Sequence, residues 1–436
     1  MALAALCALV LTACASDPAP TPASSSASVH AEEPGRAATS ATGSLYGRVT
    51  ARDGTVYEGP LRWGGNEEAL WTHAFNGVKD ENPWAEYAPE PSSGPDTVFR
   101  LRLPWAEDDL RRPFMARLGD VARIEALGEG LRDVMTDRAK YNPTVRVTLK
   151  SGTAVDLDRL ASSDFDDGLR VWDARHGVVD LGPRDIQSVD LMAGNPSREA
   201  PDRLFGTVHT RAGQDFTGAL QWNREASLQS DALVVATDAG ERRLRFGAVR
   251  ALRRLPDGAA LVTTREGRDL SVVQAAAHRG VYVDDPRYGR VLVSWSAFDR
   301  ADLARGGPGP DYDDFPPGRP LAGTVETRDG RRLTGRLVYD LDESETTETL
   351  DAPRRGIDYT LPFVLVASVD LGAGTTSPVR VTLRSGERLE LDRDGDLGDQ
   401  NAGLLVFAAN ARHPVYVPWS DVARIALDSV ATDRAP

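Results

Sequence analysis

Apolar and polar residues alternate over short stretches of this chain, with a glycine turn between successive runs. Residues 379–391 read VRVTLRSGERLEL, residues 145–157 read VRVTLKSGTAVDL, and a weaker copy occupies 260–272. A period of two places alternate side chains in a core and in water, which is the pattern of half-buried β-strands. The Asp329-Gly330 pair between two such runs indicates a hairpin turn, because glycine accepts the positive φ that a tight turn needs.

A longer repeat accompanies this alternation. Residues 45–63, 204–222 and 321–339 align without a gap. The aligned positions hold glycines, a valine, an arginine and a closing aromatic residue: Gly47, Gly206 and Gly323; Val49, Val208 and Val325; Arg52, Arg211 and Arg328; Gly54, Gly213 and Gly330; Gly59, Gly218 and Gly335; Trp63, Trp222 and Tyr339. The alternating stretches form a second unit that also recurs three times. It ends in aligned segments at 179–191, 291–303 and 415–427. The sequence therefore predicts three tandem pairs of β-units.

The length of each unit suggests its architecture. A unit of about 55 residues with four or five short strands has the size of a small β-barrel. We predict an all-β fold of three tandem pairs of small β-barrel units, which resemble SH3-like and Sm-like barrels in strand pattern. A six-bladed β-propeller is the alternative. The Pro/Gly-rich linker at 304–320 favours separate pairs, because propeller blades follow one another closely.

The spacing of the repeats also sets the domain boundaries. We predict the first pair at 45–193, the second at 204–304, a linker at 305–320, the third pair at 321–428 and a tail at 429–436. The first pair carries about 40 extra residues by the same alignment, because its two units are spaced more widely than those of the other pairs.

The amino terminus is apolar. Residues 2–13 form an uncharged run of the length of a secretory signal, which is too short to span a bilayer. The run ends in Leu-Thr-Ala-Cys at 11–14, which resembles the lipobox of bacterial lipoproteins at all four positions. The resemblance implies cleavage after residue 13 and lipid on Cys14. A signal of this kind normally opens with Lys or Arg, whereas the first basic residue here is Arg36, so we expect translation to start further upstream.

Residues 14–44 are rich in Ala, Ser, Pro and Thr, a composition that predicts a disordered tether. Ala15, rather than Asp, follows the lipidated cysteine. By the same resemblance, this points to the outer membrane of a two-membrane bacterium and to a cell-envelope location. Cys7 would leave with the signal, so the folded body would contain no thiol and no disulfide.

Charge and motifs narrow the function classes. The 436 residues carry 51 basic and 65 acidic side chains, for a net charge of -14, which argues against nucleic acid as a partner. No nucleophile elbow, zinc-protease, P-loop or C-x-x-C motif occurs in the sequence. His209 occupies the repeat position of Thr50 and Glu326, so we predict a solvent-facing strand residue rather than a catalytic base.

The aromatic residues of the insertion are the candidate binding residues. Tryptophans that recur at one repeat position are expected in the core, whereas those of the insertion depart from the scaffold. Loops carried by a β-scaffold commonly bind ligands, and aromatic rings supply contact area at low entropic cost. The candidate set, set against a loop that packs on its own barrel, is Trp71, Trp84, Trp105, His73 and Tyr87.

An acidic glycine loop is the candidate metal site. Asp392, Asp394, Asp396 and Asp399 lie in the sequence DRDGDLGD, and Ca²⁺ prefers oxygen ligands from such flexible loops. The EF-hand pattern fails at its glycine and glutamate positions, so a solvated acidic turn is the alternative. No other cofactor is expected.

Together these features predict a non-catalytic, lipid-anchored cell-envelope protein that acts as a multivalent binding or scaffolding module. Its expected partners are the membrane, through the lipid, and an envelope protein or peptidoglycan. One alternative is a carbohydrate-binding lipoprotein that uses the insertion tryptophans. The other is a hydrolase with an unrecognised site.

Overall fold

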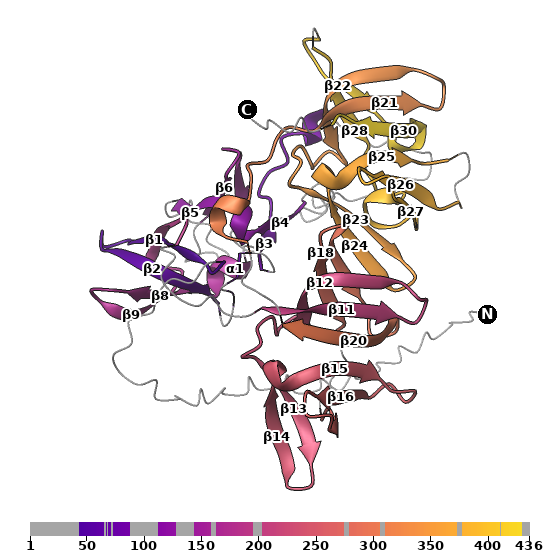
Figure 1. Ribbon diagram of the computed structural model, residues 1–436. Coiled ribbons are helices and arrows are strands. Elements are labelled where there is room, and N and C mark those ends of the chain that lie inside the picture. The colour runs from indigo at the N-terminus through magenta and orange to yellow at the C-terminus, as the bar shows by residue number, and fades with distance from the viewer. Residues whose placement is uncertain are drawn as a thin grey trace, which may run out of the picture. The chain divides into compact units, whose positions relative to one another are not determined.

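The structure is a computed structural model in which three sets of ten strands follow one another. It describes residues 43–64, 67, 69–70, 73–87, 112–127, 144–157, 163–194, 203–273, 279–305, 310–372, 377–409 and 411–429. Each set corresponds to one predicted pair, and each half of a set contains two hairpins followed by a single strand (Figure 1).

The first pair contains strands β1 (Tyr46–Ala51), β2 (Val56–Trp63), β3 (Ala74–Val78), β4 (Pro113–Arg117), β5 (Val121–Leu127), β6 (Thr144–Leu149), β7 (Ala154–Leu157), β8 (Leu169–Asp173), β9 (Gly177–Leu181) and β10 (Ile186–Leu191). Its short helices are η1 (Ala85–Tyr87), η3 (Leu118–Asp120) and α1 (Ser163–Asp166).

The second pair contains strands β11 (Leu204–Thr210), β12 (Asp215–Trp222), β13 (Ala232–Thr237), β14 (Gly240–Arg245), β15 (Val249–Arg254), β16 (Ala260–Thr264), β17 (Asp269–Ser271), β18 (Val281–Asp285), β19 (Gly289–Val293) and β20 (Phe298–Arg305). The short helix η4 (Phe246–Ala248) precedes β15.

The third pair follows η5 (Tyr312–Asp314) and contains strands β21 (Ala322–Thr327), β22 (Arg332–Tyr339), β23 (Thr349–Arg354), β24 (Ile357–Pro362), β25 (Val366–Asp370), β26 (Val379–Leu383), β27 (Arg388–Leu391), β28 (Leu404–Phe407), β29 (Val415–Val417) and β30 (Val422–Leu427). Its short helices are η6 (Phe363–Leu365), η7 (Gly395–Leu397) and η8 (Trp419–Asp421).

The two units of each pair exchange their last strands. The first sheet has the order β7-β6-β5-β10-β1-β2-β8-β9, so the last strand of each unit lies beside the first hairpin of its sister. The third pair repeats this order, and the second pair repeats it with β24 and β23 added at one end. The predicted all-β tandem fold is confirmed. The predicted closure into separate small barrels is wrong for the described residues, which form open antiparallel sheets, and these do not form a propeller.

Buried residues hold the exchanged strands together. Ile124 on β5 pairs with Val189 on β10, and the equivalent pairs are Leu252 with Ala301 and Val369 with Ile425. All six side chains are almost completely buried. Burying such apolar side chains contributes about 1.5–3 kcal/mol each for the larger ones, so the central strand pair stabilises both units at once.

The recurring aromatic residues occupy equivalent core positions, as the repeat predicts. Trp63, Trp222 and Tyr339 are all buried. The ring centroid of Trp222 lies 5.7 Å from that of Phe298, and that of Tyr339 lies 5.7 Å from that of Trp419, both with edge-to-face geometry. Each pair therefore closes its core with an aromatic cluster at the end of its second strand.

The repeated glycines mark places where neighbouring strands approach too closely for a side chain. A Cβ atom on Gly59 would lie 2.0 Å from the carbonyl oxygen of Trp172, and one on Gly218 would lie 2.0 Å from that of Asp284. Gly335 has the same relation to Phe407, at 2.1 Å. Because the obstacle is backbone, it cannot rotate away, which explains why these positions are glycine in all three pairs.

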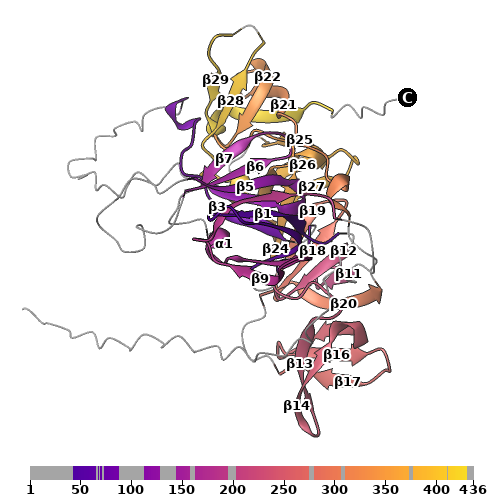
Figure 2. The same ribbon diagram turned by 90° about the vertical axis from the view of Figure 1, so that its left-hand side faces the viewer.

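The second hairpin of each pair's first unit packs differently in the three pairs. β24 pairs with β19, so the β23–β24 hairpin extends the sheet of the second pair. The β13–β14 hairpin forms a separate two-stranded sheet and projects from the second pair in both views (Figures 1 and 2). The β3–β4 hairpin is also a separate two-stranded sheet. The second and third pairs share one hydrophobic core, while the first has its own.

We expect Gly59→Ala to lower the melting temperature of the protein. Its Cβ would clash with the Trp172 backbone, and overpacking of this kind costs about 1–3 kcal/mol. Calorimetry of the purified protein measures the effect. Gly182→Ala is the matched control in the same pair, because its nearest obstacle is the flexible Asp185 side chain at 3.4 Å. Equal melting temperatures for the two variants would contradict the close-approach explanation.

Candidate functional site

The predicted binding residues of the insertion that the structure describes, His73, Trp84 and Tyr87, do not form one surface. Trp71 and Trp105, like the predicted lipidation residue Cys14, lie outside the described residues. Trp84 and Tyr87 pack against a small hydrophobic cluster of the third pair. The ring of Trp84 lies 5.8 Å from that of Phe407, and the Arg336 guanidinium lies over the Trp84 ring. These two aromatic residues therefore dock the insertion onto another part of the chain.

His73 is a core residue in the structure. It is buried, and its Nδ1 accepts a hydrogen bond from the backbone N–H of Ala69 at 3.1 Å. Burial, followed by the nearby Arg290 charge, lowers the pKa of His73 to about 4. The imidazole is therefore neutral at physiological pH and positions the turn before β3.

The four aspartates of the predicted calcium loop have separate roles. Asp392 pairs with Arg354, Asp394 accepts from the backbone N–H of Gly395 at the start of η7, and Asp396 accepts from that of Asp351 at 2.6 Å. Asp399 is exposed. Within the described part of the chain, no group of three or more His, Cys, Asp or Glu side chains is placed to hold a metal ion. The loop does not bring these carboxylates together as a calcium site.

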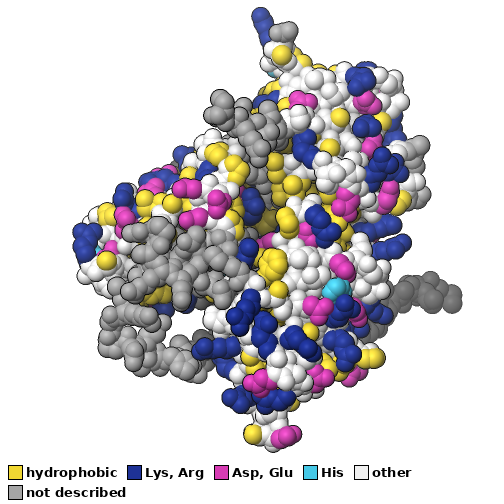
Figure 3. All heavy atoms as spheres, viewed as in Figure 1, with side chains coloured by type: hydrophobic (Ala, Val, Ile, Leu, Met, Phe, Trp, Pro, Cys, Tyr) yellow, Lys and Arg dark blue, Asp and Glu magenta, His cyan; other side chains and the backbone are white. Residues whose placement is uncertain are grey.

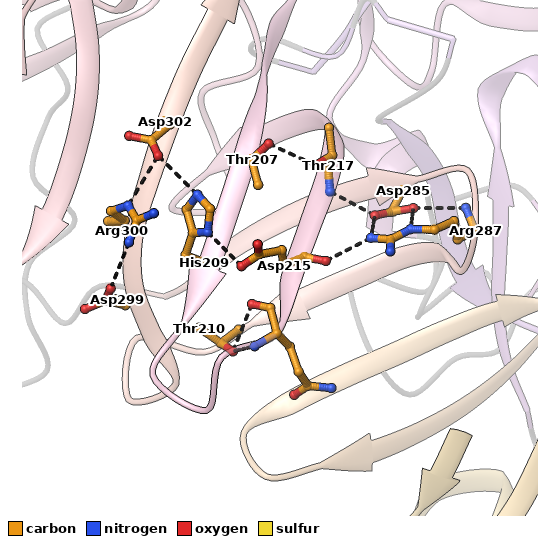
Figure 4. Close-up of polar contacts among 11 residues, drawn as sticks. Thr207, His209, Thr210, Asp215, Thr217, Asp285, Arg287, Asp299, Arg300 and Asp302 are labelled. Carbon is orange, nitrogen blue, oxygen red and sulfur yellow. Dashed lines mark hydrogen bonds and ion pairs between the residues drawn. The ribbon is translucent and has the colours of Figure 1, made fainter. Parts of the chain in front are cut away.

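His209 lies among carboxylates on the outer face of the second sheet (Figure 4). Its Nδ1 is 2.7 Å from Asp215 Oδ1, and its Nε2 is 3.1 Å from Asp302 Oδ2. The equivalent position in the third pair forms an ion pair between Glu326 and Arg332. His209 is thus one member of a cross-strand polar ladder, and both of its nitrogens face carboxylates rather than a hydroxyl nucleophile.

The strongest candidate site is a groove where the three pairs meet, which we call the junction groove. Its volume is about 570 Å³, and it is lined by all three pairs and by the linker between the second and third. Apolar side chains of Met115, Phe205 and Phe315 contribute to its walls. Figure 3 shows hydrophobic side chains gathered in the middle of one face, with Lys and Arg side chains around them. A preformed apolar hollow with a few polar groups is typical of a binding site.

More arginines than carboxylates line this groove. Asp285 is held by Arg287, with a 2.6 Å contact, and also accepts the backbone N–H of Thr217. Asp284 lies 3.8 Å from the Nε of Arg290, and burial raises the pKa of its carboxyl despite the surrounding arginines. Arg117, Arg203, Arg287 and Arg290 outnumber these two carboxylates on the lining.

The linker fixes one wall of the groove. The hydroxyl of Tyr312 donates to the carbonyl of Val121 at 2.8 Å, and the Lys150 ammonium lies 3.4 Å from the centre of the Tyr312 ring. Lys150 also donates to the carbonyl of Phe315 at 3.1 Å. Tyr312 and Phe315 belong to the hydrophobic core of the first pair. A segment that joins the second and third pairs therefore serves as part of the first.

A second hollow, of about 200 Å³, holds the insertion against the third pair, and we call it the acidic chamber. Lys79, which follows β3, is buried in it. Its Nζ lies 2.5 Å from Asp342 Oδ1 and 3.3 Å from Glu348 Oε1. Arg112 approaches Asp340 at 3.7 Å. The carboxylates that line the chamber outnumber its two cations: Asp120, Asp340, Asp342, Glu343, Glu348, Asp351 and Asp396.

Burial and crowding shift the ionisation of this chamber. Burial opposes the charge on Lys79, but Glu348 and Asp342 outweigh it and hold the pKa of Lys79 above its ordinary value. Burial raises the pKa of Asp340 to about 6, although the Ala402 N–H and Arg112 oppose the shift. Burial also raises the pKa of Asp396 to about 8, against the hydrogen bond from Asp351. The chamber therefore combines a buried lysine that keeps its charge with two carboxyls, Asp340 and Asp396, whose ionisation burial opposes.

Sequence reasoning did not predict either hollow. Lys79 is one of three lysines after residue 44, and segment 340–348, DLDESETTE, is rich in acids. These opposite charges are the one sequence signal that points to the chamber. Segment 340–348 makes the same turn as 223–231 of the second pair, with Glu348 in the place of Asp231, but it carries more acids. The pairing of Lys79 with this segment joins residues more than 250 positions apart, which no local pattern specifies.

Comparison of the chain with models of known protein families, with curated proteins and with solved structures finds no match. In the part of the chain that the structure describes, no helix has both the length and the apolar character needed to cross a membrane. The inference of function therefore depends on the geometry of the two hollows.

We expect Lys79→Met to destabilise the protein strongly at pH 8. The variant keeps the length of the side chain but leaves Asp342 and Glu348 buried without their cation, and breaking a buried pair in this way costs about 3–5 kcal/mol. Thermal unfolding measures the loss. The control is Arg268→Met, which removes an ion pair to Glu266 whose side chains are 70% and 73% exposed and whose expected contribution is small. A loss no larger than that of the control would show that the chamber does not hold the insertion.

We expect Asp396→Asn to stabilise the protein at pH 8 and to have little effect near pH 4. The folded carboxyl, with a pKa of about 8, keeps a proton that the unfolded chain releases near the ordinary value of 3.8, so the stability of the wild type falls as pH rises through this window. Asparagine retains an oxygen to accept the Asp351 N–H and carries no charge. Melting temperatures from pH 4 to 9 test this, with exposed Asp399→Asn as control. A gain that does not depend on pH would contradict the assignment.

Proposed function

We propose that this chain is a non-catalytic, lipid-anchored protein of the cell envelope that binds a partner in the junction groove. The observation that carries the proposal is the groove itself, a preformed and largely apolar hollow of about 570 Å³. Large apolar hollows on a folded protein are sites of ligand or partner binding more often than accidents of packing.

The construction of the groove supports a binding role. Its walls come from β-strands and from a linker that Lys150 and Tyr312 fix to the first pair. Groups held on such a scaffold are positioned before a partner arrives, so little conformational entropy is lost on binding. Met115, which is 40% exposed, presents an unusually accessible apolar side chain to the groove. Methionine adapts to partners of varied shape.

The composite lining changes the form of binding that tandem repeats suggest. Three equivalent pairs would favour three similar sites and multivalent binding. The junction groove instead combines the equivalent hairpins β3–β4 and β23–β24 of the first and third pairs with the second pair's main sheet and the linker. The second pair's own equivalent hairpin, β13–β14, does not line it. We therefore propose one principal site, with the repeated sheets acting as its scaffold.

The lipid anchor rests on the resemblance of residues 11–14 to a lipobox, with the chain from 15 to 44 as tether. A tether of about 30 residues would, as a flexible coil of this composition, have a root-mean-square span of roughly 30 Å. Anchored in this way, the groove would sample a thin layer next to the membrane, where its local concentration toward envelope partners is high.

We expect a photo-reactive amino acid at position 115 to cross-link one abundant partner in the native envelope. The control is the same amino acid at Val364, whose exposed fraction of 38% matches the 40% of Met115 but which does not line the groove. Mass spectrometry identifies the adducts. Identical adducts from both positions would refute binding in the groove. Adducts to wall glycan from position 115 alone would favour the carbohydrate-binding alternative.

A further inference from the structure

The β3–β4 hairpin leaves one edge of β4 unpaired among the described residues. Two hydrogen bonds fix the ladder of this hairpin. The Lys79 N–H donates to the Arg112 carbonyl at 2.9 Å, and the Leu118 N–H donates to the His73 carbonyl at 3.1 Å. Opposite residues of an antiparallel ladder alternate between hydrogen-bonded and non-hydrogen-bonded pairs. Residues 113, 115 and 117 therefore belong to non-hydrogen-bonded pairs, and their backbone groups point away from β3.

The contacts of β3 agree with this assignment. Asn76 lies opposite Met115 in the register, and its N–H donates outward to the Asp164 carboxylate at 2.6 Å instead of to β4. Within the described part of the chain, the backbone N–H groups of Met115 and Arg117 have no hydrogen-bond partner. β4 therefore presents two unpaired main-chain donors along its free edge.

The free edge of β4 borders both hollows. Every residue from 112 to 116 lines the acidic chamber, and Met115 and Arg117 line the junction groove. Successive side chains of a strand point to opposite faces, so a hollow that touches consecutive residues runs along the edge of the strand rather than over one face. The two hollows share Met115, Thr347 and Thr349. They therefore follow the free edge one after the other, and such an edge is a template for an added strand.

The opposite wall of the hollows contains a further unpaired strand position. The Phe363 N–H donates to the Glu348 carbonyl at 3.0 Å, so the backbone of Thr349, the next residue, points away from β24. Asp351 also points away, and its N–H donates to the Asp396 carboxylate on η7 at 2.6 Å. Among the described residues, the Thr349 N–H has no such partner. Because Thr349 lines both hollows, its N–H is a third main-chain donor for a segment that lies there.

The charges of the groove favour an acidic occupant. Four arginines and two aspartates line it, and Asp120, which binds Arg117 at 2.7 Å, adds a third carboxylate nearby. Burial raises the pKa of Asp284, which favours its uncharged form, whereas arginine stays charged. The groove therefore carries excess positive charge in a chain whose net charge is -14. An acidic group on the occupant would complement this charge.

We propose that the junction groove takes an extended peptide of a partner protein, which adds a strand to the free edge of β4 and carries an acidic residue at the end that lies beside Arg117. This inference rests on the proposed binding function and names its ligand class. Main-chain bonds to Met115 and Arg117 set the register of the peptide, and its apolar side chains contact the groove walls. Because β4 offers two donors, the walls and the arginines supply the remaining affinity.

Two peptide pools test the ligand class. The full chain carrying Cys14→Ala, which cannot be lipidated at that residue, is titrated with fluorescein-labelled eight-residue peptides in which Val, Ile or Phe alternates with Thr and which end in two Glu. We expect saturable binding by fluorescence polarisation, and binding at least about fivefold weaker for a second pool that ends in two Lys. The net negative charge of the chain would by itself give the reverse order. Equal or reversed affinities would overturn the acidic preference.

Failure of this inference and failure of the proposed function give different results. No binding of the Glu pool would overturn strand addition, while one partner cross-linked at Met115 would still support binding in the groove. A cross-link from position 115 to another part of the same chain would overturn the partner peptide as occupant.

Met115→Pro tests the main-chain bond. Proline removes the N–H that faces the hollow but not a bond to β3, so the hairpin should remain folded. Met115→Ala is the matched control, because it removes the same side chain and keeps the N–H. We expect Met115→Pro to bind the Glu pool at least about tenfold more weakly than Met115→Ala. Equal affinities of the two variants would overturn strand addition.

The peptide provides the same test if Met115→Pro does not fold. Each amide of the tightest-binding peptide is methylated in turn and the affinity for the unchanged chain is measured. Strand addition requires that methylation weakens binding at every second residue, because alternate amides face β4. A loss that is uniform along the peptide, or no loss at any position, would overturn the proposal.

Discussion

The exchange of last strands between sister units is the constraint on which the rest of this structure depends. Because β5 lies between β10 and the β6–β7 hairpin, and β10 between β5 and the β1–β2 hairpin, neither unit completes its sheet without the other. The buried contact of Ile124 with Val189, repeated in the other pairs, closes both halves together. A pair is therefore the smallest cooperative element of this chain. The close approach of strands that the repeated glycines permit follows from the same crowding at the sheet.

The exchange leaves the second hairpin of each first unit outside the main ladder, and this freedom is where the pairs diverge. β23–β24 extends a neighbouring sheet, β13–β14 projects, and β3–β4 reaches the third pair. Each of these hairpins also contacts the hairpin that opens the second unit of its pair. The contacts are a bridge between Lys79 and Leu157 in the first pair, a bridge between Val235 and Val272 in the second, and a hydrogen bond from the Asp392 N–H to the Pro353 carbonyl in the third. The same hairpin position thus extends a neighbouring sheet in the third pair, forms a separate projecting sheet in the second, and holds the insertion on the third pair in the first. Variation at the hairpins changes the surface without disturbing the sheets.

The buried ion pairs of Lys79 with Asp342 and Glu348 decide where the insertion docks on the third pair. Apolar contacts such as that between Trp84 and Phe407 would hold the insertion on many surfaces. Lys79 is satisfied where Asp342 and Glu348 converge, and displacing it would leave carboxylates buried without a cation. The chamber therefore selects one docking position. This lowers the stability of the fold at neutral pH, because burial raises the pKa of Asp340 and Asp396 and so disfavours their ionised forms. The junction groove depends on this choice, because Met115 and Thr347 line both hollows.

The sequence by itself determined the strands, the six units and their grouping in pairs, because alternation and glycine turns are local and three copies reinforce one another. It also placed Trp63, Trp222 and Tyr339 in the core, since a residue that recurs at one repeat position has the same packing environment. Tertiary structure alone decided which strands pair, because β5 and β10 are both short alternating strands that end their units, and that local pattern does not say which of them lies beside β1. It also decided that the insertion docks on the third pair and that His73 is buried. Those outcomes depend on charges and surfaces far apart in the chain, such as Lys79 and Asp342, whose meeting is set by the packing of whole sheets.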